Sequence, residues 1–205
     1  FQVAAISAAS TPVVINELMA ANSGAVLDPQ GEQEDWIELF NPNAQAVDVS
    51  GWMLTDDQED PAKYSIPSGR SIPAGGYLLI WADNEEGQTT SESDPHAAFG
   101  LTGTGESMGL YTPDGRQVDY IAFAAQVQNV TEGRYADGSS SIFQMAVPTP
   151  RTTNKLFQAT SLVRTGNAMR VNWNIRPSMQ YRVLYTDSAS STNWQAWGAD
   201  IQTNS

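Results

Sequence analysis

Closely spaced turn signals constrain the fold of this chain more than any other feature of its sequence. Pro-Gly, Asp-Pro and Asp-Gly combinations recur at 28–31, 67–69, 73–76 and 113–115, and short runs of alternating apolar and polar residues lie between them. A period of two is typical of half-buried β-strands, and frequent turns leave little room for long helices. The sequence therefore predicts an all-β fold.

The alternating runs locate the expected strands. They lie near residues 13–20, 35–41, 46–48, 52–55, 63–66, 77–82, 107–111, 117–123 and 132–135. The Pro113–Gly115 turn between two of them is the strongest hairpin signal, because Asp-Gly accepts the positive φ values that a short loop requires. The polar stretch at 83–96 is expected to be a long loop.

The prolines and threonines of 147–154 mark the end of a first unit, and we expect an extended linker there. The first unit is predicted to span 13–154. Residues 1–12 are apolar, small and uncharged at their start, and they are interpreted as an N-terminal arm or the remnant of a secretory signal. A second unit at 155–205 contains alternating runs at 168–173 and 181–186. It has too few residues for an independent sandwich, so we expect it either to be incomplete or to depend on the first unit.

Composition excludes several functions. The formal net charge is −13 with only 10 Lys and Arg, whereas nucleic-acid binding requires a basic surface. The absence of cysteine excludes disulfides and thiolate metal ligands. No apolar run is long enough to predict a membrane span.

The sequence offers no catalytic residues. His96 is the one histidine, and its place in a polar loop predicts that it is solvated. No nucleophile elbow accompanies it. Gly103–Gly105 lacks the lysine and the helix that a phosphate-binding loop needs. We therefore expect a protein that is not an enzyme.

Two acidic segments are candidates for calcium binding, and no other cofactor is indicated. Hard carboxylate oxygens in loops suit Ca²⁺ better than transition metals. The segments differ from an EF-hand, and the alternative is that their aspartates cap turns in solvent. The candidate ligands are Asp28, Glu32 and Asp35 in the first segment and Asp56, Asp57 and Asp60 in the second.

Three carboxylates, one of them already named as a calcium candidate, lie among apolar strand residues and must be paired or hydrogen-bonded if they are buried. These are Glu17, Asp35 and Glu38, for which the expected partners are Arg134, Arg116, Lys63 or backbone N–H groups at a sheet edge.

The tryptophans divide into two groups. Trp36, Trp52 and Trp81 lie in apolar strands and are expected in the core. Trp194 and Trp197 lie in a polar stretch, where they either stack on a sugar or pack against missing residues of a truncated second domain. Together with Trp173 they are also expected to be the residues through which the second unit would dock on the first.

Several segments, in order and spacing, carry a resemblance to the lamin-tail domain. They are 15–17 (INE), 35–41 (DWIELFN), 47–54 (VDVSGWML), 72–77 (IPAGGY), 105–111 (GESMGLY) and 133–135 (GRY). The resemblance covers about residues 13–154 and implies an immunoglobulin-like antiparallel β-sandwich of the secreted bacterial type, without catalytic residues. Residues 157–205 more weakly resemble a truncated fibronectin-type-III-like module.

The resemblance implies a non-catalytic binding or scaffolding module of a larger exported bacterial protein, located outside the cell or on its surface. Such a module would attach to a protein, a surface or a polysaccharide. The alternative is an accessory domain that positions a secreted hydrolase whose catalytic domain is absent from this chain.

Overall fold

The computed structural model describes residues 12–155 in full. Of the remaining chain it describes the backbone of 159–165, 168–173, 180–181, 184–185, 195–196 and 201–202. Internal contacts divide the chain into two units, Phe1–Leu156 and Phe157–Ser205.

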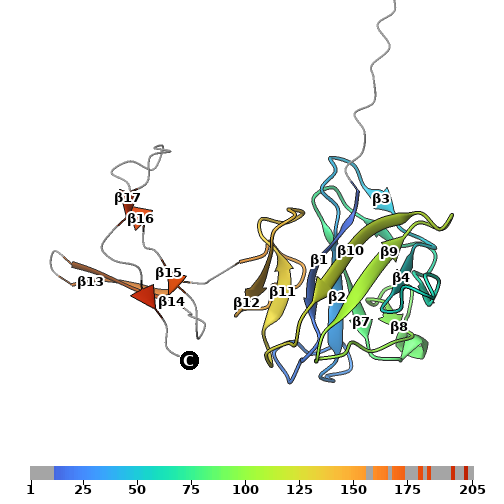
Figure 1. Ribbon diagram of the computed structural model, residues 1–205, viewed down its shortest axis with the longest axis horizontal. Helices are drawn as coiled ribbons and strands as arrows, with labels where there is room; N and C mark the ends of the chain where they lie inside the picture. The colour runs from blue at the N-terminus through green and yellow to red at the C-terminus, as the bar shows by residue number, and fades with distance from the viewer. Residues whose placement is uncertain are drawn as a thin grey trace, which may run out of the picture. The chain divides into compact units, whose positions relative to one another are not determined.

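The larger sheet of the first unit has 6 strands in the order β12, β11, β1, β2, β7, β8 (Figure 1). Their bounds are β1 Val14–Met19, β2 Asp35–Phe40, β7 Tyr77–Ala82, β8 His96–Ala97, β11 Thr131–Arg134 and β12 Ile142–Met145. The pairs are antiparallel except β7 with β8, which is parallel. The first strand in the sequence therefore lies inside the sheet, between β2 and β11.

A second sheet of 4 strands, in the order β10, β9, β4, β5, packs against the first (Figure 1). Its strands are β4 Met53–Thr55, β5 Tyr64–Ser65, β9 Glu106–Tyr111 and β10 Gln117–Phe123. A short pair, β3 Val47–Asp48 with β6 Ser71–Ile72, lies at one end, and a single 3₁₀ turn, η1, covers Glu86–Gln88.

The main core lies between the two sheets. Alternation explains its composition, because every second residue of each strand points inward. Side chains from both layers are fully buried there, including Ile15, Leu39, Leu54, Ile80 and Leu110.

The outer face of the larger sheet is covered as well. Cross-strand partners share a face, and the register places Glu17 opposite Glu38 and Met19 opposite Trp36. Trp36 in turn lies opposite Trp81, and with Met19 and Leu79 the two indoles form a second, smaller apolar cluster. Both faces of this sheet are therefore buried around β1 and β2.

The all-β prediction and the two-layer immunoglobulin-like sandwich are confirmed. Every strand predicted in 13–135 is present within one or two residues of its expected bounds. Within residues 12–155 the sequence missed three strands, β6, β8 and β12, which have 2 to 4 residues each. In the second unit it missed the 7-residue strand β13, Ala159–Thr165.

The second unit contributes two-stranded pairs. β13 Ala159–Thr165 pairs with β14 Ala168–Trp173, which has its predicted bounds. The run expected at 181–186 corresponds to two short strands, β15 Gln180–Tyr181 and β16 Leu184–Tyr185. β17 Gln195–Ala196 pairs with β16, and β18 Ile201–Gln202 pairs with β15.

Candidate functional site

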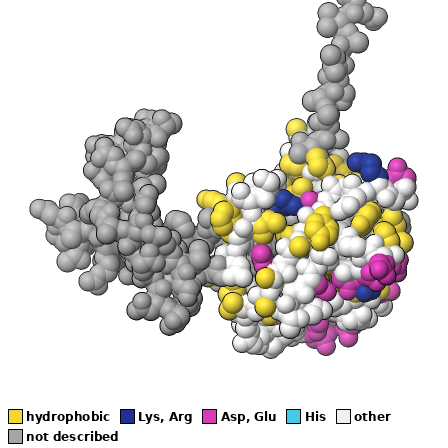
Figure 2. All heavy atoms as spheres, in the orientation of Figure 1, with side chains coloured by type: hydrophobic (Ala, Val, Ile, Leu, Met, Phe, Trp, Pro, Cys, Tyr) yellow, Lys and Arg dark blue, Asp and Glu magenta, His cyan; other side chains and the backbone are white. Residues whose placement is uncertain are grey.

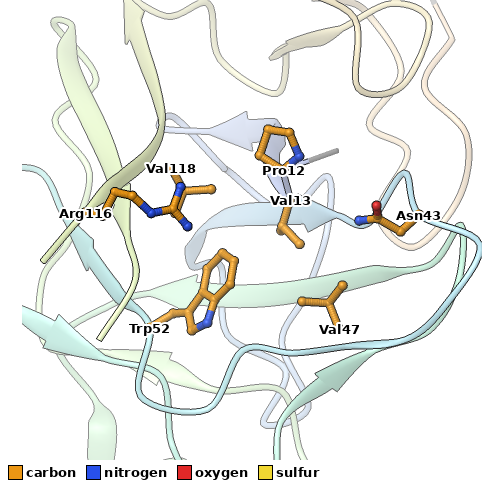
Figure 3. Close-up of a pocket in the computed structure, with 7 residues that line it drawn as sticks. All are labelled: Pro12, Val13, Asn43, Val47, Trp52, Arg116 and Val118. Atoms are coloured by element: carbon orange, nitrogen blue, oxygen red, sulfur yellow. The ribbon is translucent and has the colours of Figure 1, made fainter. Parts of the chain in front are cut away.

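A pocket of about 270 Å³ lies at the end of the sandwich where the two sheets meet. Its walls come from the residues before β1, the β2–β3 loop, β3, the turn before β4, and the start of β10. Figure 3 shows the side chains converging on a shared space, with the Trp52 indole and the Arg116 guanidinium on one side. The lining residues are Pro12, Val13, Asn43, Val47, Trp52, Arg116 and Val118.

Trp52 forms the aromatic wall of this pocket, which corrects the prediction that it belongs wholly to the core. The indole packs against the core but remains partly exposed. Gly51 has a φ of 73°, and its N–H donates to the Ile66 carbonyl at 2.8 Å. The Trp52 carbonyl accepts from the Ile66 N–H, also at 2.8 Å. This anchored turn lies at the end of the sandwich, so the side chain reaches the rim rather than the centre.

Arg116 is the one charged side chain that lines the pocket. It is exposed, and within residues 12–155 its guanidinium forms no ion pair. Asn43 brings an amide to the other side, and its Nδ2 donates to Asn41 Oδ1 at 2.8 Å. Asn41 is buried and donates to the carbonyls of Ile72 and Pro73. The Asn43 amide is thus held in place by the scaffold, through Asn41.

The first acidic segment forms a tight turn around a buried aspartate. Asp28 Oδ1 accepts the N–H groups of Gln30 at 3.0 Å and Glu32 at 2.6 Å, as turn-forming aspartates do. Asp35 Oδ1 accepts the Asn22 N–H at 2.9 Å, and burial raises the pKa of Asp35 to about 6. These carboxylates are engaged in local structure.

The second acidic segment is organised in the same manner. Asp56 pairs with Lys63 at 2.6 Å, and Asp57 Oδ1 accepts the Glu59 N–H at 2.9 Å, while Asp60 is exposed. Figure 2 shows acidic side chains gathered at the lower right of the first unit, over the loops beside β4 and β8. Among the described residues, no three His, Asp or Glu side chains are placed to hold one metal ion. Calcium binding stays a prediction.

His96 is buried, and the expectation of a solvated loop histidine is wrong. The side chains of His96 and Asp83 are both fully enclosed, with Nδ1 and Oδ2 2.5 Å apart. The polar loop folds back so that His96 pairs with Trp81 as part of β8, and its N–H donates to Thr89 Oγ1 at 2.8 Å. An imidazole enclosed in this way is out of reach of a substrate.

The buried carboxylates Glu17 and Glu38 have different partners from those expected. Glu17 accepts hydrogen bonds from the Thr131 hydroxyl at 2.6 Å, the Thr149 hydroxyl at 2.8 Å and the Thr149 N–H at 3.1 Å. Glu38 Oε2 accepts the Arg151 N–H. Backbone N–H partners are confirmed, but they come from the segment after β12 rather than from a sheet edge, and the arginine and lysine partners are wrong.

Arg134 instead joins the two sheets. Its guanidinium pairs with Asp119 at 2.9 Å, and its Nε donates to the Ile15 carbonyl at 2.8 Å. Asp119 also accepts the Ile15 N–H at 2.7 Å. The Arg134–Asp119 ion pair therefore connects β1 with β10 through hydrogen bonds to the Ile15 backbone.

Burial dominates the protonation of both glutamates. Glu17 and Glu38 are each 0% exposed. Desolvation raises the pKa of Glu17 to about 7, against the lowering effect of the Thr131 and Thr149 hydrogen bonds. It raises the pKa of Glu38 to about 8, against the Arg151 N–H. Both groups are therefore poised to titrate near neutral pH.

The other tryptophans are core residues or lie outside the described side chains. Trp36 and Trp81 are buried as predicted. Trp194, Trp197 and the side chain of Trp173 lie outside the residues that the structure describes.

The two antiparallel layers and their connections define an immunoglobulin-like β-sandwich. Residues 6–125 match the family model of the Lamin Tail Domain, and the chain belongs to that family. This domain is a non-catalytic immunoglobulin-like module. No curated protein matches the chain. Strands β11 and β12 and the segment that follows them lie beyond the matched residues.

Within the described part of the chain, no helix is long and apolar enough to cross a membrane.

Proposed function

We propose that the first unit is a non-catalytic attachment module of a larger exported protein, and that its ligand is a neutral polysaccharide bound at the Trp52–Arg116 pocket. The observation that carries this proposal is the combination of a partly exposed indole and two polar side chains around one pocket. The family supports a role in binding rather than catalysis.

A sugar ring suits this arrangement chemically. It has an apolar C–H face, which packs on an indole, and a rim of hydroxyls, which hydrogen-bond to a guanidinium and an amide. Trp52 supplies the flat surface, while Arg116 and Asn43 supply the polar groups. Pockets for drug-sized ligands generally measure about 300–1,000 Å³. This pocket, at about 270 Å³, lies just below that range, which suits a ligand as small as a single sugar ring.

The charge of the protein favours a neutral polymer over an acidic one. A net charge of −13 repels polyanions at long range. A single guanidinium in the pocket does not offset that field. The pocket is therefore assigned to a neutral sugar, with Arg116 as a hydrogen-bond donor.

Binding of the full chain to neutral oligosaccharides tests this proposal. The panel contains gluco-, manno-, xylo- and N-acetylglucosamine oligomers, with oligogalacturonate as the acidic comparison, and binding is measured by isothermal titration calorimetry. At least one neutral oligomer is expected to bind, and Trp52→Ala and Arg116→Ala are each expected to weaken it at least tenfold. Tyr120→Ala is the matched control, because Tyr120 is an exposed aromatic residue outside the pocket.

Two outcomes would overturn the proposal. One is the absence of binding to every neutral oligomer. The other is binding that persists unchanged in Trp52→Ala while circular dichroism shows an intact fold. Preferential binding of oligogalacturonate would reassign Arg116 as the partner of a carboxylate and reject the neutral ligand.

A further inference from the structure

The segment 149–154, named here the strap, crosses the outer face of the larger sheet and is held there by two buried glutamates. Thr149 donates both its N–H and its hydroxyl to Glu17. The Arg151 N–H donates to Glu38 Oε2. Glu17 and Glu38 are directly opposite each other on β1 and β2, so both carboxyls face the same strap.

The strap is not relaxed in this position. Arg151 has a φ of 61°, which is a left-handed backbone conformation. A residue that carries a side chain is destabilised in this conformation, so it persists only where the surrounding contacts hold it. The hydrogen bond to Glu38 is one such restraint, and the ion pair between Arg151 and Asp94 is another. Glu38 itself is incompletely satisfied, because its Oε1 is buried with no hydrogen-bond partner within residues 12–155.

The charged groups around the two carboxyls are mixed but mainly negative. Glu17 faces Asp137 and Glu38, and its remaining neighbours are the hydroxyls of Thr131 and Thr149. Glu38 faces Glu17, Asp137 and the one cation, Arg151. On β7, Tyr77 donates its hydroxyl to Asp137 at 2.7 Å and adds no charge while it is protonated. Two ionised glutamates here would repel each other without water to screen them.

We propose that Glu17, Glu38 and the strap form a pH-operated latch, which is closed while the two carboxyls are neutral and opens as both ionise. In the closed state Glu17 is protonated and neutral. Its carboxyl group then donates a hydrogen bond to a neighbouring hydroxyl or accepts one from it, without the desolvation penalty of a buried charge. Ionisation strengthens the hydrogen bonds that Thr149 and Arg151 donate, but the cost of burying the two charges is larger, because desolvation is the dominant effect on the pKa of both groups. Ionisation of both groups therefore favours hydration of the carboxylates and lifting of the strap. The strained Arg151 backbone relaxes in the same step.

Asn154 anchors the strap to residues other than the two glutamates. Asn154 Nδ2 donates to the carbonyls of Asn16 and Arg134 at 3.0 and 2.9 Å, and the Asn154 N–H donates to Asp137 at 2.9 Å. These bonds do not depend on the two glutamates. Opening is therefore expected to begin at Thr149 and Arg151 and to reach Asn154 last.

Opening has a consequence for the rest of the chain, because the strap precedes the second unit in sequence. Release of the strap, 149–154, adds its length to the stretch that joins the two units. An extended residue spans about 3.4 Å, so the joining stretch lengthens by roughly 20 Å. The latch thereby makes the distance to which the chain after residue 155 can extend from the first unit dependent on pH. This inference is independent of the ligand pocket.

Amide hydrogen exchange of the full chain tests the latch. Protection factors, corrected for the intrinsic pH dependence of exchange, are measured at pH 6 and pH 8.5 for Thr149 and Arg151. The core amides of Ile37 and Ile80 serve as the internal reference for global unfolding. We expect strap protection to fall at least tenfold more than core protection as the pH rises.

Two variants separate titration from other effects. The Glu17→Gln/Glu38→Gln double variant should retain strap protection at pH 8.5, whereas Glu59→Gln, a change at an exposed loop residue, should lose it as the unmodified chain does. In the unmodified chain, an equal fall of the strap and core protection factors between pH 6 and pH 8.5 would overturn the latch. This measurement does not depend on the folding of any variant. A fall in the double variant equal to that in the unmodified chain would overturn it as well.

Discussion

Replacing Glu17 by Gln is expected to flatten the dependence of stability on pH. The glutamate is fully buried, and its folded-state pKa of about 7 exceeds the ordinary value of 4.5. Between these values the folded protein holds a proton that the unfolded chain has released. The stability contributed by the neutral form is therefore complete below pH 4.5 and is lost as the pH rises through about 7.

The magnitude follows from the size of the shift. Each pKa unit corresponds to about 1.36 kcal/mol, so the change from 4.5 to about 7 corresponds to about 3 kcal/mol for Glu17 between pH 5 and pH 8. Glutamine remains neutral at every pH and resembles the protonated acid in shape. The variant should therefore lose about 3 kcal/mol less than the unmodified chain over this range, with a residual slope from Glu38.

Urea unfolding followed by tryptophan fluorescence at pH 5, 6, 7 and 8 measures this difference. Glu59→Gln controls for the loss of one negative charge from a strongly acidic protein, since Glu59 is exposed. Parallel pH profiles for Glu17→Gln and the unmodified chain would refute the reasoning. So would an unmodified chain whose stability rises from pH 5 to pH 8.

Four further outcomes are expected. In chemical unfolding, Ile80→Ala should cost about 2–5 kcal/mol, because its side chain is fully buried in the core, and Trp52→Ala should cost less than the roughly 3–5 kcal/mol of a fully buried tryptophan. Arg134→Ala should cost about 3–5 kcal/mol in the same assay, since it leaves Asp119 unpaired in a largely buried position. If the acidic loops bind calcium, 10 mM Ca²⁺ should raise the melting temperature, and chelation should reverse the rise. The free energy of unfolding should increase by about 2.7 kcal/mol at a hundredfold excess of Ca²⁺ over Kd. An unchanged melting temperature would end that hypothesis.

The strands that alternation predicts were found because burial on one face imposes a period of two on the sequence. β10 is an example, with Ile121 and Phe123 buried and Tyr120 and Ala122 exposed. β7 was found by a different signal, a short continuous apolar run bounded by turn residues. The strands missed within residues 12–155 are too short to carry such a period. β8 consists of His96 and Ala97, and it exists because the preceding polar loop returns to the sheet edge, which the local composition does not encode.

The site was less predictable because its contacts are non-local. The sequence shows that a carboxylate at Glu17 must be satisfied, but not that Thr131 and Thr149 satisfy it. Pro148 and Pro150 predicted an extended linker, whereas the residues after them are bound to the sheet. Trp52 has the sequence environment of a core residue, and only the position of its turn at the end of the sandwich places it on a pocket wall.

The central position of β1 also sets the order in which the first unit can fold. β1 is the first strand made, yet its partners on one side are β11 and the strap, and Glu17 contacts a residue 132 positions later. Contacts of such sequence separation form late and slow the folding of β-sandwiches. During synthesis, one edge of an apolar strand stays unpaired until about residue 134 has emerged from the ribosome. Until then that nascent edge is exposed to mispairing with other chains.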